Sequence, residues 1–216
     1  MPDVNFLGPA GRLEGKYFSQ NKPETPIAVV LHPHPLHNGT MNNKVTYNVY
    51  KTFVKHGFNV LRFNFRGVEN SEGTFDNGIG EISDAAAAID WLHAQHAHAP
   101  EIWLAGFSFG SWIATQMLMR RPDLHRFVAI APPAGLYDFG FLSPCPTSGL
   151  VIYGTADEIT PPHDTEALMR HTVRQKGITI SAAKVRGADH FFTNHMDDLT
   201  NTLSAYIKQE SGKKTR

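Results

Sequence analysis

The sequence is poor in the features that mark several classes of protein. It has one cysteine, Cys145, in 216 residues, so it cannot form an internal disulfide, and we expect a reducing, cytoplasmic location. No apolar run approaches the roughly 18 residues of a membrane-spanning helix. The N-terminus lacks a basic segment followed by an apolar one, so we expect no signal peptide.

The chain also has no excess of either charge, because 20 Lys and Arg residues balance 20 Asp and Glu residues. Nucleic-acid-binding domains usually carry a basic face, and lipid-surface sensors a polybasic stretch, so neither partner is expected. A hydrophobic share of 41% is ordinary and excludes global disorder. We expect residues 1–208 to form a single domain and residues 209–216, QESGKKTR, a flexible C-terminal tail.

Short apolar runs alternate with helical patterns along most of the chain. Nearly continuous apolar strands separated by helices predict an α/β fold, with a mostly parallel central sheet and helices on both faces. The first 20 residues, with three glycines, predict a leading antiparallel hairpin. The remaining expected strands are Ile27–Leu31, Val60–Phe65, Ile102–Ala105, Phe127–Ala131, Leu150–Tyr153 and Ile178–Val185.

The turn after the expected strand Ile102–Ala105 has the pattern of a nucleophilic serine. It reads Gly106-Phe107-Ser108-Phe109-Gly110 and leads into a helical segment, which is the G-x-S-x-G motif in its strand–turn–helix context. Glycine on each side lets strand and helix pass closely. Ser108 then stands at a helix N-terminus, where free N–H groups favour developing negative charge. The alternative is a serine that only caps the helix.

A serine nucleophile needs a base, and the base needs a carboxylate that orients it. Asp157 follows the expected strand Leu150–Tyr153, and His190 follows the last expected strand in a glycine-containing loop. This is the chain order Ser, Asp, His that the motif requires. Glu158 competes with Asp157, but a shorter side chain holds an imidazole more rigidly. We therefore predict a triad of Ser108, Asp157 and His190.

These residues and the alternation around them resemble the α/β-hydrolase superfamily over about residues 15–208. The stretches LHPHPLHNGTMNNKV (31–45) and RFNFRGVENSEGTFDNGIGE (62–81) are similar to those of small cap-less bacterial hydrolases near the dienelactone hydrolases. The resemblance implies an α/β-hydrolase fold without a large lid domain and a Ser-Asp-His triad at the three positions above. Dienelactone hydrolases have cysteine where this chain has Ser108, which argues against that activity.

The histidine–proline loop after Ile27–Leu31 has two interpretations. In α/β hydrolases this loop supplies one backbone N–H group of the oxyanion hole, and the residue after the nucleophile, Phe109, supplies the other. Because proline has no N–H, His34 is the first candidate and Leu36 the second. Alternatively, His32, His34 and His37 bind a metal ion as in a zinc hydrolase, although no H-E-x-x-H pattern accompanies them.

Four further residues are candidates for substrate contact: Arg66, Phe107, Tyr137 and Ile159. Arg66 either binds an acidic substrate or braces the loop Gly67–Gly80, and whether that loop gates the site stays open. Only about 17 residues separate Ala131 from Gly149, too few for a lid domain. An open site favours small soluble substrates.

Together these features predict a serine hydrolase of the carboxylesterase or thioesterase type. It cleaves small soluble esters or thioesters through an acyl-enzyme, needs no cofactor, and is a monomer or homodimer. The alternative is a non-catalytic binding or scaffold protein on a hydrolase fold, since a fold does not determine a function.

Overall fold

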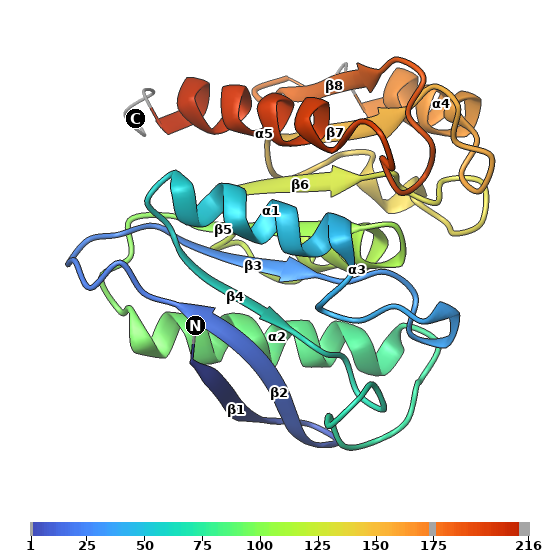
Figure 1. The fold of residues 1–216 in the computed structure, drawn as a ribbon. Helices are drawn as coiled ribbons and strands as arrows, with labels where there is room; N and C mark the ends of the chain where they lie inside the picture. Colours follow the sequence, from blue (N-terminus) through green and yellow to red (C-terminus); the bar gives the residue numbers. More distant parts are fainter. Residues whose placement is uncertain (1, 173–175, 212–216) are drawn as a thin grey trace.

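The structure, a computed structural model, describes residues 2–172 and 176–211, and its strands form one sheet in the order β1-β2-β4-β3-β5-β6-β7-β8 (Figure 1). The strands are β1 (Asp3–Gly8), β2 (Gly11–Phe18), β3 (Ile27–Leu31), β4 (Asn59–Phe63), β5 (Ile102–Phe107), β6 (Arg126–Ile130), β7 (Gly149–Gly154) and β8 (Ile180–Val185). The helices are α1 (Lys44–Lys55), α2 (Ile79–Gln95), α3 (Phe109–Leu118), α4 (Pro162–Thr172) and α5 (Met196–Ser211), with short 3-10 helices η1 (Pro35–His37) and η2 (Gly140–Leu142).

The expected α/β architecture is confirmed. Strands β3 to β8 pair in parallel, while β1 and β2 form the predicted antiparallel hairpin, which joins the sheet against β4. The C-terminal tail was expected to begin at residue 209, but α5 continues through Ser211. Glu210 in its last turn is buried and lies 3.1 Å from the Arg126 guanidinium. Residues 212–216 lie outside the described residues.

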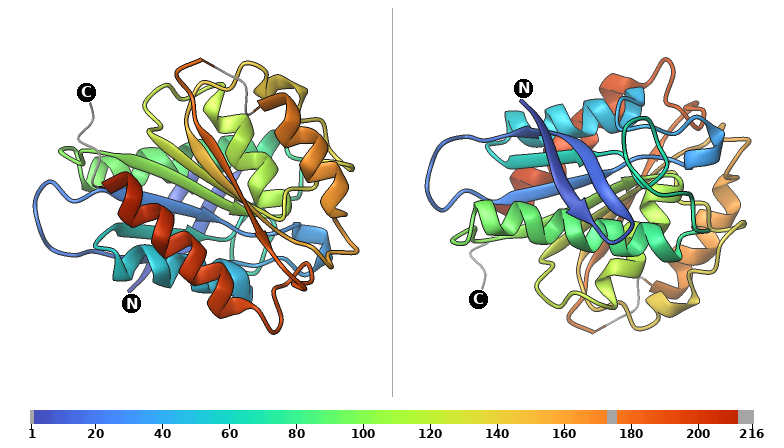
Figure 2. Two further views of the ribbon diagram at one scale, coloured as in Figure 1. Left: turned by 90° about the horizontal axis from the view of Figure 1, so that it is seen from above. Right: turned by 90° about the horizontal axis from the view of Figure 1, so that it is seen from below.

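The sheet is covered on both faces, as its apolar strands require (Figure 2). All five residues of β3 are buried, and successive side chains of a strand point to opposite faces. Val29 packs in a cluster with residues of α2 and α3 such as Ile89 and Ile113. Val30 packs in a second cluster with residues of α1 and α5 such as Val49 and Leu203. Packing on both faces holds the strands in place, and the strands in turn position the loops that follow them.

The parallel strands end at one edge of the sheet, on the right in Figure 1, so the loops that follow them meet there. The connection between β6 and β7 contains only the short η2, and no lid-sized insertion stands in it. No helix within residues 2–172 and 176–211 is long and apolar enough to cross a membrane.

Candidate active site

The turn between β5 and α3 places Ser108 in a strained backbone conformation. Ser108 has φ 52° and ψ −121°, a backbone conformation that residues other than glycine rarely adopt. A Cβ atom on Gly106 would lie 2.1 Å from the carbonyl oxygen of Gly110. A Cβ atom on Gly110 would lie 2.5 Å from the carbonyl oxygen of His32. Both glycines are therefore required for strand and helix to meet at this turn.

Three strand ends bring Ser108, His190 and Asp157 together. The hydroxyl of Ser108, after β5, lies 3.1 Å from Nε2 of His190, after β8. Nδ1 of His190 lies 2.8 Å from a carboxylate oxygen of Asp157, after β7. When Nδ1–H donates to the carboxylate, Nε2 is free to accept the proton of the Ser108 hydroxyl. The arrangement is that of a nucleophile, its base and the group that orients the base.

Asp157 is held by a second set of hydrogen bonds. Its Oδ1 accepts the backbone N–H groups of Ile159 and Thr160, at 2.9 and 2.8 Å, and its Oδ2 accepts the Thr160 hydroxyl at 2.7 Å. Burial alone would raise the pKa of Asp157, but the hydrogen bonds from His190 and Thr160 outweigh it and lower that pKa below its usual value. Asp157 therefore stays ionised, whereas its neighbour Glu158 is exposed.

Sequence reasoning missed Thr160, although the sequence contains a signal for it. An aspartate whose side chain accepts N–H groups two and three residues later forms an Asx turn. The segment Asp157 to Thr160, followed by two prolines, fits that pattern.

The backbone N–H groups of Phe109 and His34 point to an oxyanion hole. Phe109 is the first residue of α3, where N–H groups lack partners within the helix. Neither N–H group has a hydrogen-bond partner among the residues that the structure describes. The N–H of Leu36, the second candidate, instead donates to Nδ1 of His34 at 3.1 Å. His34 is therefore the better placed of the two.

A cavity of about 470 Å³ lies in front of Ser108. Of the four candidates for substrate contact, Tyr137 and Ile159 line it. The residues around it are Pro33, His34, His37, Asn43, Ser108, Phe109, Pro133, Leu136, Tyr137, Ile159, Thr160, His190 and Phe191.

The other two candidates lie elsewhere. Phe107 is buried and packs against the ring of His190, with ring centroids 5.1 Å apart, so it supports the base without lining the cavity. Arg66 donates from Nε and from a terminal nitrogen to the Asp84 carboxylate in α2, at 2.9 and 2.7 Å. The sequence leaves open whether Arg66 binds an acidic substrate or braces the loop Gly67–Gly80. Because this bidentate pair ties its guanidinium to α2 and Arg66 does not line the cavity, a structural role is favoured.

The three histidines expected as an alternative metal site have different surroundings. His32 is fully buried, its Nδ1 lies 2.6 Å from the Pro33 carbonyl oxygen, and its Nε2 accepts the Phe65 N–H at 3.0 Å. Burial lowers the pKa of His32 to about 4, so the ring is neutral with both nitrogens in use. In the described part of the chain, no group of three or more His, Cys, Asp or Glu residues is placed to hold a metal ion. The metal-site alternative is not supported.

The chain is similar to known proteins over nearly its whole length. Residues 19–209 match the model of a family described as X-Pro dipeptidyl-peptidase (S15 family). The solved structure of a protein of unknown function from Agrobacterium tumefaciens, described as an α/β hydrolase candidate, is 48% identical. It superposes with a TM-score of 0.94 over 97% of this chain and 96% of the other.

Two further relatives extend this result. A serine hydrolase without a lid from Xanthomonas campestris is 31% identical, with a TM-score of 0.87 over 96% of this chain and 94% of the other. An uncharacterized protein from Rickettsia prowazekii is 47% identical over 211 residues, which is 96% of this chain and 89% of that protein. The likeness extends far beyond the turn around Ser108.

Proposed function

The chain belongs to the X-Pro dipeptidyl-peptidase (S15) family within the α/β-hydrolase superfamily, and from that premise we propose that it is a serine esterase or thioesterase. The resemblance to cap-less α/β hydrolases is thereby confirmed, and hydrolase activity follows at that general level. The finer proposal is supported by one observation: an unbroken chain of contacts from the Asp157 carboxylate through His190 to the Ser108 hydroxyl, at 2.8 and 3.1 Å.

In the proposed reaction, the Ser108 hydroxyl attacks the carbonyl carbon of the ester as its proton passes to Nε2 of His190. Asp157 holds the ring and stabilises its positive charge. The N–H groups of His34 and Phe109 receive the negative charge on the carbonyl oxygen. His190 then gives its proton to the departing alcohol or thiol, leaving the acyl group on Ser108.

A water molecule completes the cycle. His190 takes a proton from the water as its oxygen attacks the acyl carbon, and the same proton returns to Ser108 when the acid leaves. A free serine is restored and one ester bond has been hydrolysed. The site lies open at the strand ends, which suits small esters in solution, and the single cysteine suits a cytoplasmic location.

The family description raises a second candidate, removal of a dipeptide from a peptide N-terminus. Such an enzyme must bind a free ammonium group, for which a carboxylate is the natural partner. No Asp or Glu is among the described residues that line the cavity. This favours esters over peptides.

The direct test is the hydrolysis of 4-nitrophenyl butyrate by the wild type and by Ser108→Ala. We expect the variant to lose at least about 10⁴-fold in kcat. Ser83→Ala, at an exposed position of α2, is the matched control and should keep the wild-type rate. A serine-directed phosphonate should add its mass to the peptide that contains Ser108. Equal rates for Ser108→Ala and the wild type would refute serine catalysis.

A further inference from the structure

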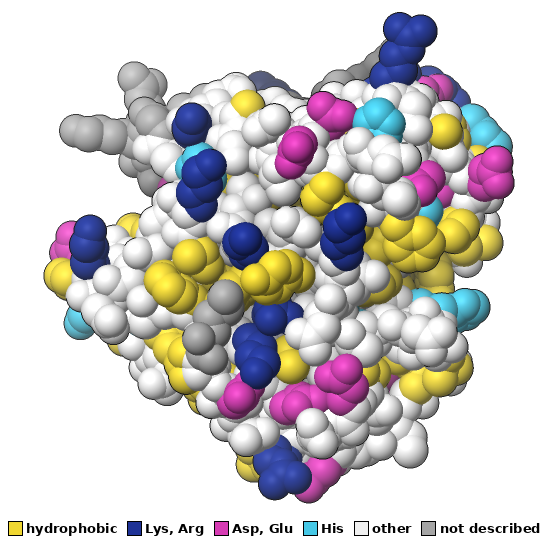
Figure 3. Space-filling model, viewed as in Figure 1, with side chains coloured by type: hydrophobic (Ala, Val, Ile, Leu, Met, Phe, Trp, Pro, Cys, Tyr) yellow, Lys and Arg dark blue, Asp and Glu magenta, His cyan; other side chains and the backbone are white. Residues whose placement is uncertain are grey.

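The cavity in front of Ser108 has two chemically different walls. One, the apolar wall, consists of Leu136, Tyr137, Ile159 and Phe191. Three of these are unusually exposed for large apolar side chains: Leu136 by 68%, Ile159 by 51% and Phe191 by 47%. The other, the donor wall, consists of His34, His37 and Asn43, from the loop around η1 and the start of α1. Figure 3 shows apolar and histidine side chains gathered at the edge where the strands end.

Each side chain of the donor wall can offer a hydrogen-bond donor to the cavity. Oδ1 of Asn43 accepts the N–H of Val45 at 2.9 Å as the cap of α1, which leaves the Nδ2 amide group to donate. Nδ1 of His34 accepts the N–H of Leu36, so the proton of the neutral ring is on Nε2. Within the described residues, the hydrogen bonds of the Asn43 side chain are made by Oδ1, and the His37 ring packs edge-on against the His34 ring, with centroids 4.6 Å apart, without a hydrogen-bond partner. All three side chains are therefore available to a substrate that offers acceptors.

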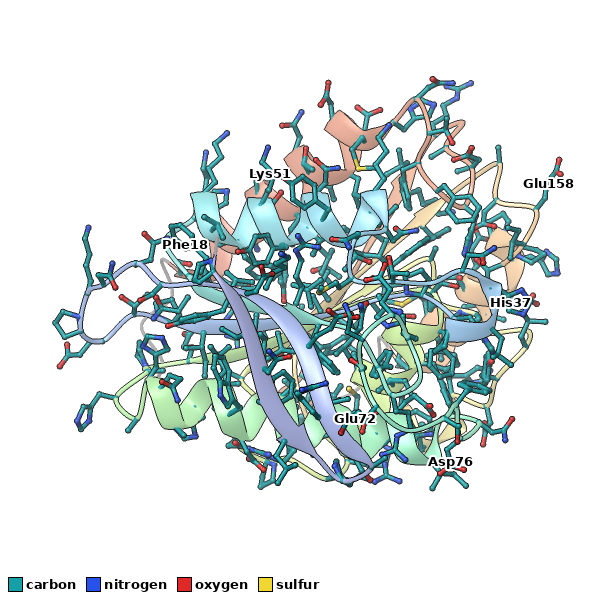
Figure 4. The ribbon with its side chains drawn as sticks, turned by 60° about the horizontal axis from the view of Figure 1, so that its bottom comes forward. Phe18, His37, Lys51, Glu72, Asp76 and Glu158 are labelled. Carbon is teal, nitrogen blue, oxygen red and sulfur yellow. The ribbon has the colours of Figure 1, made fainter. Side chains whose placement is uncertain are left out.

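No carboxylate is among the described residues that line the cavity beside the donor wall. The charged or ionisable side chains among the described lining residues are His34, His37 and His190, and Tyr137 carries a phenol. Glu158 follows Asp157 in the chain, but its side chain projects outward at a distance from His37 (Figure 4). A group rich in acceptor oxygens fits this wall, while a positive group finds no carboxylate there.

We propose that the substrates are amphiphilic esters or thioesters carrying an oxyanion group, a carboxylate or a phosphate, that binds the donor wall while an apolar part lies on the apolar wall. The inference rests on the proposed function and adds the substrate class. Both oxyanion groups offer several acceptor oxygens and a negative charge, and the two are distinguished by the test.

The test uses matched esters that differ in one charged group. In the first set, 4-nitrophenyl hexanoate is compared with the 4-nitrophenyl monoester of hexanedioic acid and with the ester whose six-carbon chain ends in a phosphate. In the second set, phenyl hexanoate is compared with 4-carboxyphenyl hexanoate, which places the charge on the alcohol side. The measured quantity is the ratio of kcat/KM for the anionic ester to that for its neutral partner. Comparing this ratio between variants cancels the intrinsic reactivities of the esters.

Asn43→Asp is the decisive variant. The aspartate retains the oxygen that caps α1 but replaces the donor group with a negative oxygen. We expect the ratio to fall about tenfold in at least one set, because two like charges then meet at the cavity wall. Whether the carboxylate or the phosphate ester loses more identifies the preferred group. Asn42→Asp is the matched control: it adds the same charge one residue earlier, outside the cavity, and should change the ratio by less than about twofold.

His37→Glu guards against a folding defect in Asn43→Asp, because His37 is exposed. It should also lower the ratio. The inference is overturned if both variants leave the ratio unchanged in both sets, or if Asn42→Asp lowers it equally. Failure of the proposed function looks different: the wild type would not hydrolyse the neutral esters, or Ser108→Ala would retain their hydrolysis.

Discussion

At the residue scale, both oxygens of the Asp157 carboxylate accept hydrogen bonds. The carboxylate accepts two backbone N–H groups and the Thr160 hydroxyl in addition to the His190 ring. The Thr160 hydroxyl also lies 3.3 Å from Nδ1 of His190, so it contacts both partners. In the proposed mechanism, Thr160 is a positioning residue that keeps the acid and the base aligned.

Asp157→Asn tests the assignment of the acid. The neutral amide cannot stabilise a charged imidazole, and its NH₂ group favours the wrong ring tautomer. We expect kcat for 4-nitrophenyl butyrate to fall about 10⁴-fold with the fold intact by circular dichroism. Glu158→Gln, which neutralises the exposed neighbour, should retain the wild-type rate. The assignment fails if the two variants exchange these behaviours.

The lowered pKa of the buried His32 ring predicts that the folded protein loses stability in mild acid. The pKa of His32 in the folded state is about 4, against an ordinary value of 6.5, so below pH 6.5 the unfolded chain binds the proton first. The free energy of unfolding should therefore fall by about 3 kcal/mol from this group as the pH drops from 6.5 to 4. The group contributes no pH dependence above pH 7.

Urea unfolding at several pH values measures this effect. His32→Gln should flatten the acid limb of the stability curve by about that amount, even if the variant is less stable at neutral pH. His98→Gln, at an exposed position, serves as the control and should follow the wild-type curve. An acid limb of equal slope in the wild type and His32→Gln would contradict the prediction.

At the element scale, the approach of α3 to β3 depends on Gly110. Its absent Cβ would lie 2.5 and 2.6 Å from the main-chain oxygens of His32 and Leu31, which cannot move as a flexible side chain would. We expect Gly110→Ala to destabilise the protein by about 3 kcal/mol and to displace the Ser108 turn, with loss of activity.

A glycine of a different kind provides the comparison. Gly57 has φ +84° but nothing within 4 Å of its Cβ position, so Gly57→Ala costs only the backbone strain of about 1 kcal/mol. Chemical denaturation measures the free energy of unfolding of each variant. Gly110→Ala should lose more of it than Gly57→Ala, because only the former adds a steric clash. Equal losses of stability would show that the close approach of α3 and β3 does not limit the fold.

At the scale of the whole molecule, the absence of a lid-sized insertion between β6 and β7 predicts simple kinetics. An enzyme that needs an interface to open a lid accelerates when its substrate passes the solubility limit. Here we expect initial rates with a sparingly soluble ester to saturate smoothly through that limit. A stepwise rise in rate at the limit would contradict an open site.

The sequence was informative where local pattern and topology decide the outcome. Continuous apolar strands, the glycines around Ser108 and the order of Asp157 and His190 each have a signature that can be read along the chain. The α/β fold followed from these patterns, and the residues proposed as the triad meet in the structure at the distances reported above.

The remaining features depend on partners that are distant in sequence. The sequence leaves two roles open for Arg66, because nothing local shows that Asp84, 18 residues later, accepts hydrogen bonds from its guanidinium. His32 reads as a possible metal ligand until Phe65, 33 residues later, is found to donate to its ring. The last turn of α5 carries Glu210, whose partner Arg126 lies 84 residues earlier in the chain. Such pairings are decided by tertiary packing, which a single sequence does not reveal.

The short connection from β6 to β7, which carries no lid-sized insertion, has a practical consequence for protein engineering. Three of its residues, Pro133, Leu136 and Tyr137, line the cavity, and η2 is its one short helical turn. The three aligned side chains instead follow the ends of β5, β7 and β8. A grafted segment in this connection can therefore select which molecules enter, while the strands that hold the chemistry stay untouched.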